Sequence, residues 1–294
     1  MPENGIPYVL TGPDGSRAVF NDDTDPDFVG LLDGEKGITG LLDGADVREN
    51  GMDLVEGDGG VHGAFYLGRR SGTLEGIIWP DPDMTAVNAR EQKLKRATRA
   101  LRADAVLSWT PTGGTPRRLL VRRKERVAIT ARRPKEFQVQ LVSASPRIEA
   151  TTESNQTITP GGAAGEIGIS SPISNQVGSG YQASGAGIVA NLGDMEAVWR
   201  ARITGPVTNP RLRNNTTGQE LRFTITLQAG EYLEVNADTH AITFGAALTP
   251  RYAALDFANS DWWLLQPGAN DIRLLSAAYS AGAQLDLYFR HAYE

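Results

Sequence analysis

The chain of 294 residues contains no cysteine. Disulfides, thiolate zinc sites and a cysteine nucleophile are therefore excluded. It has three histidines, His62, His240 and His291, and each is isolated from a second plausible ligand at the spacing of a metal site. No local Ser-His-Asp arrangement is present either. We expect the histidines to be partly exposed and structural, with no metal site, no cofactor and no catalytic residues.

Long apolar segments are also absent. No apolar run approaches the roughly 20 residues that span a bilayer, and the N-terminus MPENGIPYVL lacks the basic and apolar regions of a signal peptide. The GxGxxA string at 185–190 lies in a glycine-rich part of expected β structure, where it is not expected to bind a dinucleotide. The sequence therefore predicts a soluble chain.

Charge is distributed unevenly along the chain, whose formal net charge is −6. Residues 1–80 hold 15 acidic against 5 basic residues, a balance of −10, whereas residues 81–148 hold 6 against 16, a balance of +10. Residues 149–294 hold 14 against 8. The two opposite segments either neutralise each other within one chain or form complementary surfaces between copies.

The first half is predicted to contain short strands and one helix. Strands are expected at 17–20, 53–56, 64–67, 73–79, 106–109, 119–123, 126–130 and 137–142. The runs at 53–56 and 64–67 predict a hairpin around residues 58–60. Apolar residues at helical spacing predict an α-helix over about 84–105 with Asp83 as its N-cap. Four aspartates at 22–27 predict a solvated acidic turn, because Pro26 and the missing glycine spoil a calcium loop.

The second half is predicted to be almost entirely β. A polar stretch at 146–160 marks a boundary, so we place one domain at 1–148 and another at 149–294. A glycine-rich loop at 161–187, with a strand at 166–170, comes first. Strands then follow at about 196–204, 207–213, 220–228, 231–236, 241–245, 262–266, 271–276 and 284–290. Such a series of short strands is typical of an antiparallel β-sandwich or jelly roll.

One stretch, 205–235, is predicted to form hairpins. Residues 207–213 are expected to form one strand, Gly218 to supply a positive φ in the turn, and 220–228 to form the return strand. The apolar residues of the return strand alternate and therefore point to one face: Leu221, Phe223, Ile225 and Leu227.

Basic residues gather on the predicted helix and on the strands that follow it. Such a face can contact nucleic acid through its phosphates. Because regular aromatic residues are missing from it and an acidic segment precedes it, we favour a surface that faces a protein or is neutralised within the chain. The candidate residues for an inter-subunit or tube-facing surface are Arg90, Lys93, Arg96, Arg99, Arg102, Arg122, Arg123 and Arg126.

Short motifs follow one another in order over residues 191–275. They are N-x-G at 191–193, I-T-G-P at 203–206, N-P at 209–210, T-T-G at 216–218, A-G-E-x-L at 229–233 and W-x-L-x-P-G-x-N at 263–270. Together with LTGPDGSRAVFND (10–22) and DLVEGDGGVHGAFYLGRRSGTLEG (53–76), they resemble distal tail proteins of long-tailed phages, particularly those of actinobacteria. The signature residues, which we interpret as structural, are Gly205, Pro206, Asn209, Pro210, Thr217, Gly218, Gly230, Trp263, Pro267, Gly268 and Asn270.

The resemblance implies an N-terminal β domain that closes into a ring, usually a hexamer, beneath the tail tube. It implies a galectin-like C-terminal β-sandwich that projects outward. The expected protein is a structural component of the virion tail tip, assembled in the host cytoplasm, and not an enzyme. Its implied partners are further copies of itself, the tail tube protein, and tail-tip and receptor-binding proteins.

An alternative function is a carbohydrate-binding tail-tip module that contacts the host cell surface. Its sugar contacts would be exposed aromatic side chains, and the candidates are Tyr252, Trp262, Trp263 and Tyr279. Adjacent strand residues point to opposite faces. We therefore expect one of the two neighbouring tryptophans in the core and the other at a loop or domain contact.

Overall fold

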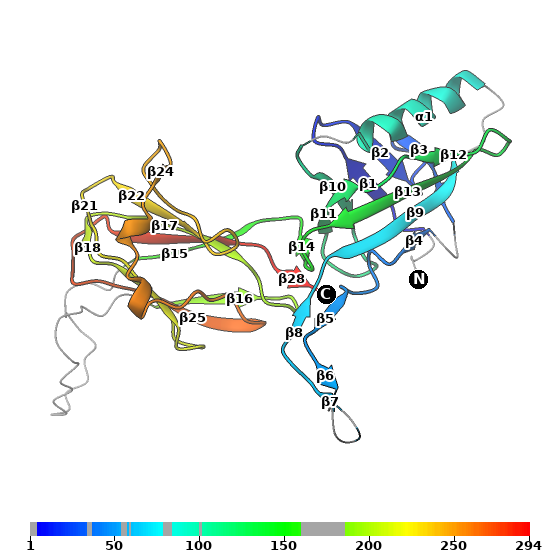
Figure 1. The fold of residues 1–294 in the computed structure, drawn as a ribbon. Coiled ribbons are helices and arrows are strands. Elements are labelled where there is room, and N and C mark those ends of the chain that lie inside the picture. Colours follow the sequence, from blue (N-terminus) through cyan, green and yellow to red (C-terminus); the bar gives the residue numbers. More distant parts are fainter. Residues whose placement is uncertain are drawn as a thin grey trace. The chain divides into compact units, whose positions relative to one another are not determined.

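The chain forms two compact units, shown as a ribbon in Figure 1. The structure is a computed structural model, and it describes residues 5–33, 37–53, 58, 60–78, 84–99, 102–159 and 186–294. The first unit comprises Met1–Thr151 with Tyr293–Glu294, and the second comprises Thr152–Ala292. The predicted division at 148/149 left the last two residues in the second domain, whereas they fold with the first. Asp83, Leu101 and most of the predicted loop at 161–187, including its strand, lie outside the described residues.

One sheet builds the first unit and closes into a barrel. Its order is β12-β13-β9-β3-β2-β1-β10-β11-β14-β28, β4 also pairs with β9, and β11 pairs with β13, which closes the path. The strands are β1 (Tyr8–Thr11), β2 (Arg17–Phe20), β3 (Phe28–Leu32), β4 (Ile38–Thr39), β9 (Arg70–Ile78), β10 (Ala105–Trp109), β11 (Arg117–Arg123), β12 (Ala128–Ile129), β13 (Glu136–Ser143), β14 (Ile148–Ala150) and β28 (Ala292–Tyr293).

Alternation of apolar and polar residues explains how the barrel fills. In β13, Phe137, Val139 and Leu141 are buried while Gln138 between them is exposed, as the sequence predicted. The registers join β13 to β9, where Leu74 lies opposite Val139. Inward-facing side chains of this kind form one core cluster across the barrel. The predicted strand at 126–130 is shorter than expected, at Ala128–Ile129.

A single described helix, α1 (Met84–Ala97), packs on β2, β3 and β9. It buries Val87, Leu94 and Ala97, which belong to the predicted apolar stripe. The prediction extended the helix to 105, which is wrong: Ala105 begins β10 and pairs with Val121 of β11. A strand with partners on both sides gains ladder hydrogen bonds that an exposed helix end lacks.

The described residues of the second unit form three antiparallel sheets. The six-stranded sheet has the order β15 (Ser154–Ile158), β27 (Gln284–Phe289), β17 (Trp199–Thr204), β22 (Tyr232–Asn236), β23 (Ile242–Phe244) and β24 (Thr249–Pro250). The four-stranded sheet has the order β16 (Ala186–Asn191), β25 (Gly268–Leu275), β19 (Arg211–Asn214) and β20 (Glu220–Arg222). The three-stranded sheet comprises β21 (Thr226–Leu227), β18 (Val207–Thr208) and β26 (Ala278–Tyr279). Two short 3₁₀ helices are η1 (Tyr252–Ala254) and η2 (Phe257–Asn259).

The two larger sheets pack face to face around one core. Ile203 and Leu285 from the six-stranded sheet and Leu212 and Ile272 from the four-stranded sheet are fully buried in the same cluster. This arrangement is the predicted antiparallel sandwich. The predicted strand at 262–266 is wrong, because there Leu265 makes only an isolated bridge to Ala197.

The 205–235 segment is more broken than predicted. The single expected strand at 207–213 is two strands in different sheets, β18 and β19, and the return strand at 220–228 is likewise split into β20 and β21. Asn209 adopts a positive φ of 49° between β18 and β19, which turns the chain from one sheet to the other. Gly218 has a φ of 79°, as the predicted turn requires.

Candidate functional site: an exposed arm and a basic surface

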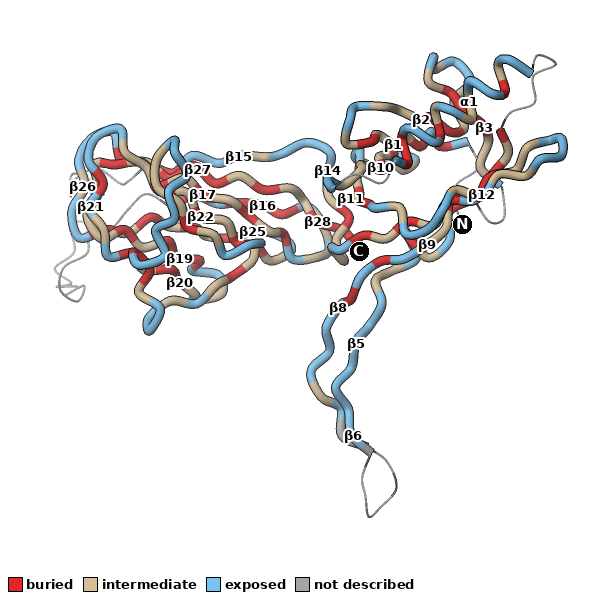
Figure 2. The backbone as a smooth tube through the Cα atoms, turned by 45° about the horizontal axis from the view of Figure 1, so that its top comes forward, coloured by how far each residue is buried: buried red, intermediate tan, exposed pale blue. Residues whose placement is uncertain are grey.

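A long two-stranded arm within residues 46–68, described at 46–53, 58 and 60–68, projects from the first unit (Figure 2). Strand β5 (Val47–Glu49) pairs with β8 (Phe65–Leu67), and β6 (Met52–Asp53) pairs with β7 (Gly60–Val61). The arm closes at its base, where the Gly68 amide donates to the Asp46 carbonyl at 2.5 Å. Gly63 is required in it, because a Cβ there would lie 1.8 Å from the Asn50 carbonyl oxygen of the facing strand. A hairpin is present in this region, as predicted, and its pairing reaches back to Val47. Residues 54–56 of the predicted first strand lie outside the described residues.

The arm exposes large apolar side chains. Met52 is 76% exposed, Val47 63%, Tyr66 60% and Phe65 59%, and Figure 2 shows the arm as mostly exposed. Neither core cluster of the described residues contains an arm residue. Sequence analysis missed this surface. A signal was present, because three consecutive large residues at 65–67 cannot all face one core from a strand.

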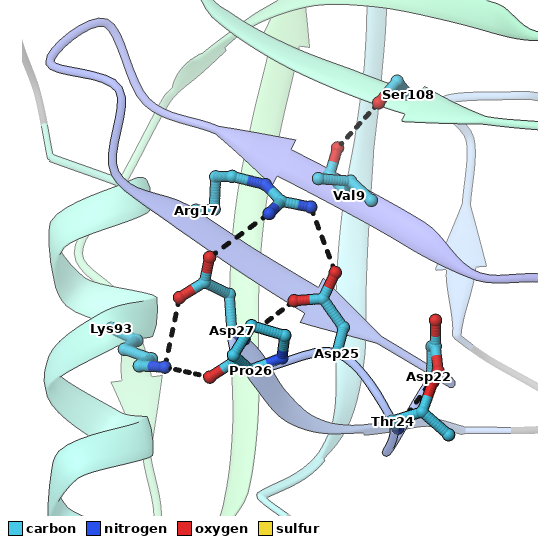
Figure 3. A network of polar contacts seen from close by, with 9 residues as sticks. All are labelled: Val9, Arg17, Asp22, Thr24, Asp25, Pro26, Asp27, Lys93 and Ser108. Carbon is cyan, nitrogen blue, oxygen red and sulfur yellow. Dashed lines mark hydrogen bonds and ion pairs between the residues drawn. The ribbon is translucent and has the colours of Figure 1, made fainter.

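Part of the predicted basic surface is engaged within the first unit. Lys93 lies 3.1 Å from the Asp27 carboxylate and also donates to the Pro26 carbonyl, as Figure 3 shows. Arg90 lies over the Phe28 ring at 5.4 Å, and Arg122 forms an ion pair with Asp104. These contacts bind α1 to the start of β3 and fix one end of β11.

The acidic turn at 22–27 is also engaged within the unit. Arg17 pairs with Asp25 at 3.2 Å and with Asp27 at 3.3 Å (Figure 3). Hydrogen bonds from the Thr24 side chain and amide hold the pKa of Asp22 below its ordinary value. Among the residues that the structure describes, no cluster of histidine and carboxylate side chains is arranged to hold a metal ion.

Two further arginines, Arg99 and Arg123, lie with the ion-paired Arg122 at the end of α1. Arg99, Arg122 and Arg123 line one pocket of about 60 Å³. The rest of its lining is apolar except for Thr98, and the apolar residues are Leu10, Ala97, Ala103, Ala105, Val121 and Leu141. Arg96, Arg102 and Arg126 are exposed but do not line this pocket. We call the pocket and its three arginines the arginine pocket.

Tyr293 attaches the chain end to the first unit. Its hydroxyl lies 3.1 Å from the Thr115 hydroxyl, and the Arg117 guanidinium lies 4.1 Å from the centre of its ring. Burial lowers the pKa of the nearby Arg70 guanidinium, while the charges of Glu294 and Asp43 act in the opposite direction. A cation–π contact together with a hydrogen bond accounts for the return of the last residues to this unit.

Signature residues of the second unit mostly hold turns. Asn270 is fully buried, donates to the carbonyls of Gln266 at 2.8 Å and Gly268 at 3.1 Å, and accepts from the Gln266 amide at 2.9 Å. It thereby holds the turn that contains Pro267. Positive φ angles occur at Gly218, Gly230 and Gly268. A Cβ at Gly205, next to Pro206, would lie 2.4 Å from the Gln228 carbonyl oxygen. Asn209 and Pro210 lie between β18 and β19, and Thr217 precedes Gly218 in the turn between β19 and β20.

The candidate sugar-contacting aromatic residues do not form one platform. Trp263 is 3% exposed and its carbonyl accepts a hydrogen bond from the Trp199 indole at 2.9 Å, so its proposed sugar contact is wrong. Trp262 is half-buried and stacks on His240 at 4.2 Å. Tyr279 pairs with Val207 in the three-stranded sheet, and Tyr252 is exposed in η1. One tryptophan is thus in the core, as expected.

The other two histidines have local structural partners. His62 contacts the Glu49 carboxylate across the arm. The ring of His291 accepts a hydrogen bond from the Leu192 amide at 3.1 Å, and burial lowers its pKa. In the described part of the chain, no helix has the length and apolar character to cross a membrane.

Comparisons with known proteins find a family-model match within the second unit. Residues 192–293 match the family model of the siphovirus-type tail component, C-terminal domain. A comparison with curated proteins gives no match. The motifs at 191–275 therefore predicted the family correctly, while an actinobacterial origin stays a prediction.

Two solved structures share the fold over the whole chain. The Dit protein (gp 19.1) of phage SPP1, described as a paradigm of the hub adsorption apparatus in phages that infect Gram-positive bacteria, has a TM-score of 0.61 at 15% identity, covering 96% of this chain and 98% of that chain. A chain of the phage P2 baseplate in its activated conformation with Ca has a TM-score of 0.50 at 12% identity, covering 97% of each. At these identities the comparison shows the fold.

Proposed function

Because the second unit belongs to the siphovirus-type tail component family and the whole chain has the fold of SPP1 Dit, we propose that the protein is a structural hub at the distal end of a siphophage tail. In this function several copies form a closed ring, with a hexamer as the expected size. The ring connects the tail tube protein to tail-tip and receptor-binding components. The protein acts by assembly, not by catalysis, within the virion, and its assembly takes place in the host cytoplasm.

The observation that carries this proposal is the family match together with a fold match over 96% of the chain. The exposed arm supports it independently. A lone two-stranded hairpin is marginally stable in water, and large exposed apolar patches mark interaction sites. The first unit therefore carries a surface suited to self-association, as a ring requires.

The proposal is tested on the purified full chain by mass photometry and negative-stain imaging. The expected result is a closed ring with a mass close to that of six chains. A chain that remains a monomer at micromolar concentration, both alone and with the tail tube protein, would contradict the ring and with it the hub function.

A further inference from the structure

The two faces of the arm differ in chemistry. The registers pair Val47 with Leu67 and Glu49 with Phe65, so these four side chains share one face of the ribbon. Arg48 and Tyr66 pair on the opposite face. The first face is thus apolar with a single carboxylate. The carboxylate, Glu49, also contacts His62 within the arm. An apolar surface next to a cation is the kind of partner that suits this face.

The arm is also acidic as a whole. Residues 46–68 contain five acidic residues, Asp46, Glu49, Asp53, Glu56 and Asp58, against the single base Arg48, a balance of −4. Complementary potential directs protein association and suppresses wrong partners. A basic surface therefore suits the arm.

The arginine pocket has both of these properties. Its lining is mostly apolar apart from Thr98 and three arginines. Of these arginines, Arg122 is already paired with Asp104, so Arg99 and Arg123 are the cations offered to a partner. Its volume of about 60 Å³ admits the tip of one apolar side chain. Arg99 is exposed and lies close enough to Asp14 to lower the pKa of that carboxyl slightly, after the larger contributions of Ser16.

The arm and the pocket are different surfaces of the same unit. Figures 1 and 2 both show the arm pointing away from helix α1, whose last residue, Ala97, lines the pocket. A contact between two different surfaces is heterologous, and repeating it produces a ring or a filament. We infer that the Val47–Phe65 face of the arm of one copy docks on the arginine pocket of the next copy. This inference rests on the proposed ring and names the contact that closes it.

A mixing experiment tests the inference with two variants of the full chain. Phe65→Asp places a charge on the docking face and leaves the pocket intact. The double variant Arg99→Glu, Arg123→Glu reverses the charge of two arginines in the pocket and leaves the arm intact. Mass photometry is expected to show a ring for the wild type and one chain mass for each variant alone. An equimolar mixture is expected to give two chain masses, because one intact arm meets one intact pocket.

Matched controls separate the contact from general damage. Tyr66→Asp changes an equally exposed aromatic residue on the other face of the arm, and Arg126→Glu reverses an exposed arginine outside the pocket. Both controls are expected to form rings. Rings from Phe65→Asp, or no dimer in the mixture when both variants unfold at the wild-type temperature, would overturn the inference. A wild type that forms no ring would instead overturn the proposed function.

Discussion

The arm and the 205–235 segment both contain short antiparallel strands, yet the apolar residues of these strands differ in burial. In 205–235, Leu212, Leu221 and Leu233 are fully buried in the core of the second unit. In the arm, Val47 and Phe65 are exposed by 63% and 59%. The two regions resemble each other locally and differ in what covers them. Apolar strand residues that pack in no core of their own chain can contact another chain.

The largest effect on the free energy of unfolding is expected from a substitution of Phe223, which is buried in the second unit beside β20. Phe223→Ala should lower the free energy of unfolding of that unit by about 3–5 kcal/mol, because it leaves a cavity as well as removing buried area. Chemical denaturation followed by tryptophan fluorescence measures the change. A loss under about 1 kcal/mol would mean that Phe223 does not sit in a packed core.

A smaller effect is expected from Glu220, which is buried and accepts hydrogen bonds from Arg211 at 3.0 Å and Arg222 at 2.6 Å. Burial raises its pKa, but the two arginines outweigh burial and hold the pKa below 4.5. The carboxylate therefore stabilises the folded state above pH 4.5, and this contribution is lost as the pH falls through the lowered pKa. Glu220→Gln should cost about 1–3 kcal/mol at neutral pH and flatten the loss of stability below pH 4.5.

The control for that variant is Glu231→Gln, a change at a carboxylate that accepts a hydrogen bond from the Gln228 amide in a turn. It should change the free energy of unfolding by less than about 1 kcal/mol. It should also leave the loss of stability below pH 4.5 as steep as in the wild type. If the wild type and Glu220→Gln lost stability equally steeply below pH 4.5, the Arg211–Glu220–Arg222 cluster would not govern the stability of the protein in acid.

The smallest effect on the isolated chain is expected from Phe65. Phe65→Ala should change the free energy of unfolding of the dissociated monomer by less than about 0.5 kcal/mol, because the side chain is outside both described cores. Thermal unfolding at a concentration below assembly measures it. If Phe65→Ala lowered the free energy of unfolding as much as Phe223→Ala, the arm would be packed against its own chain.

Local patterns in the sequence predicted much of the fold. The alternation at 137–142 predicted β13, and the stripe at Val87, Leu94 and Ala97 predicted the buried face of α1. The turn at Gly218 followed from its requirement for positive φ. These features depend on residues that lie close together in the sequence. Long-range features were not predictable, because barrel closure depends on the pairing of β11 with β13 and not on either strand alone.

The candidate site was predicted only in part. Net charge indicated a basic surface, but it could not distinguish Lys93, which is engaged with Asp27, from Arg99 at the pocket. The hairpin was predicted, whereas its exposure was not, since a strand pattern does not reveal what covers it. The return of Tyr293 to the first unit depends on its contacts with Thr115 and Arg117, which are distant in sequence.

The most direct test is hydrogen–deuterium exchange on the ring and on the monomeric Arg99→Glu, Arg123→Glu variant. Amides of residues 46–68 should exchange at least tenfold more slowly in the ring than in the monomer, while amides of 205–235 should exchange equally in both. Arm amides that exchange at the same rate in both samples would contradict the account, because the arm would then have no partner in the assembled protein.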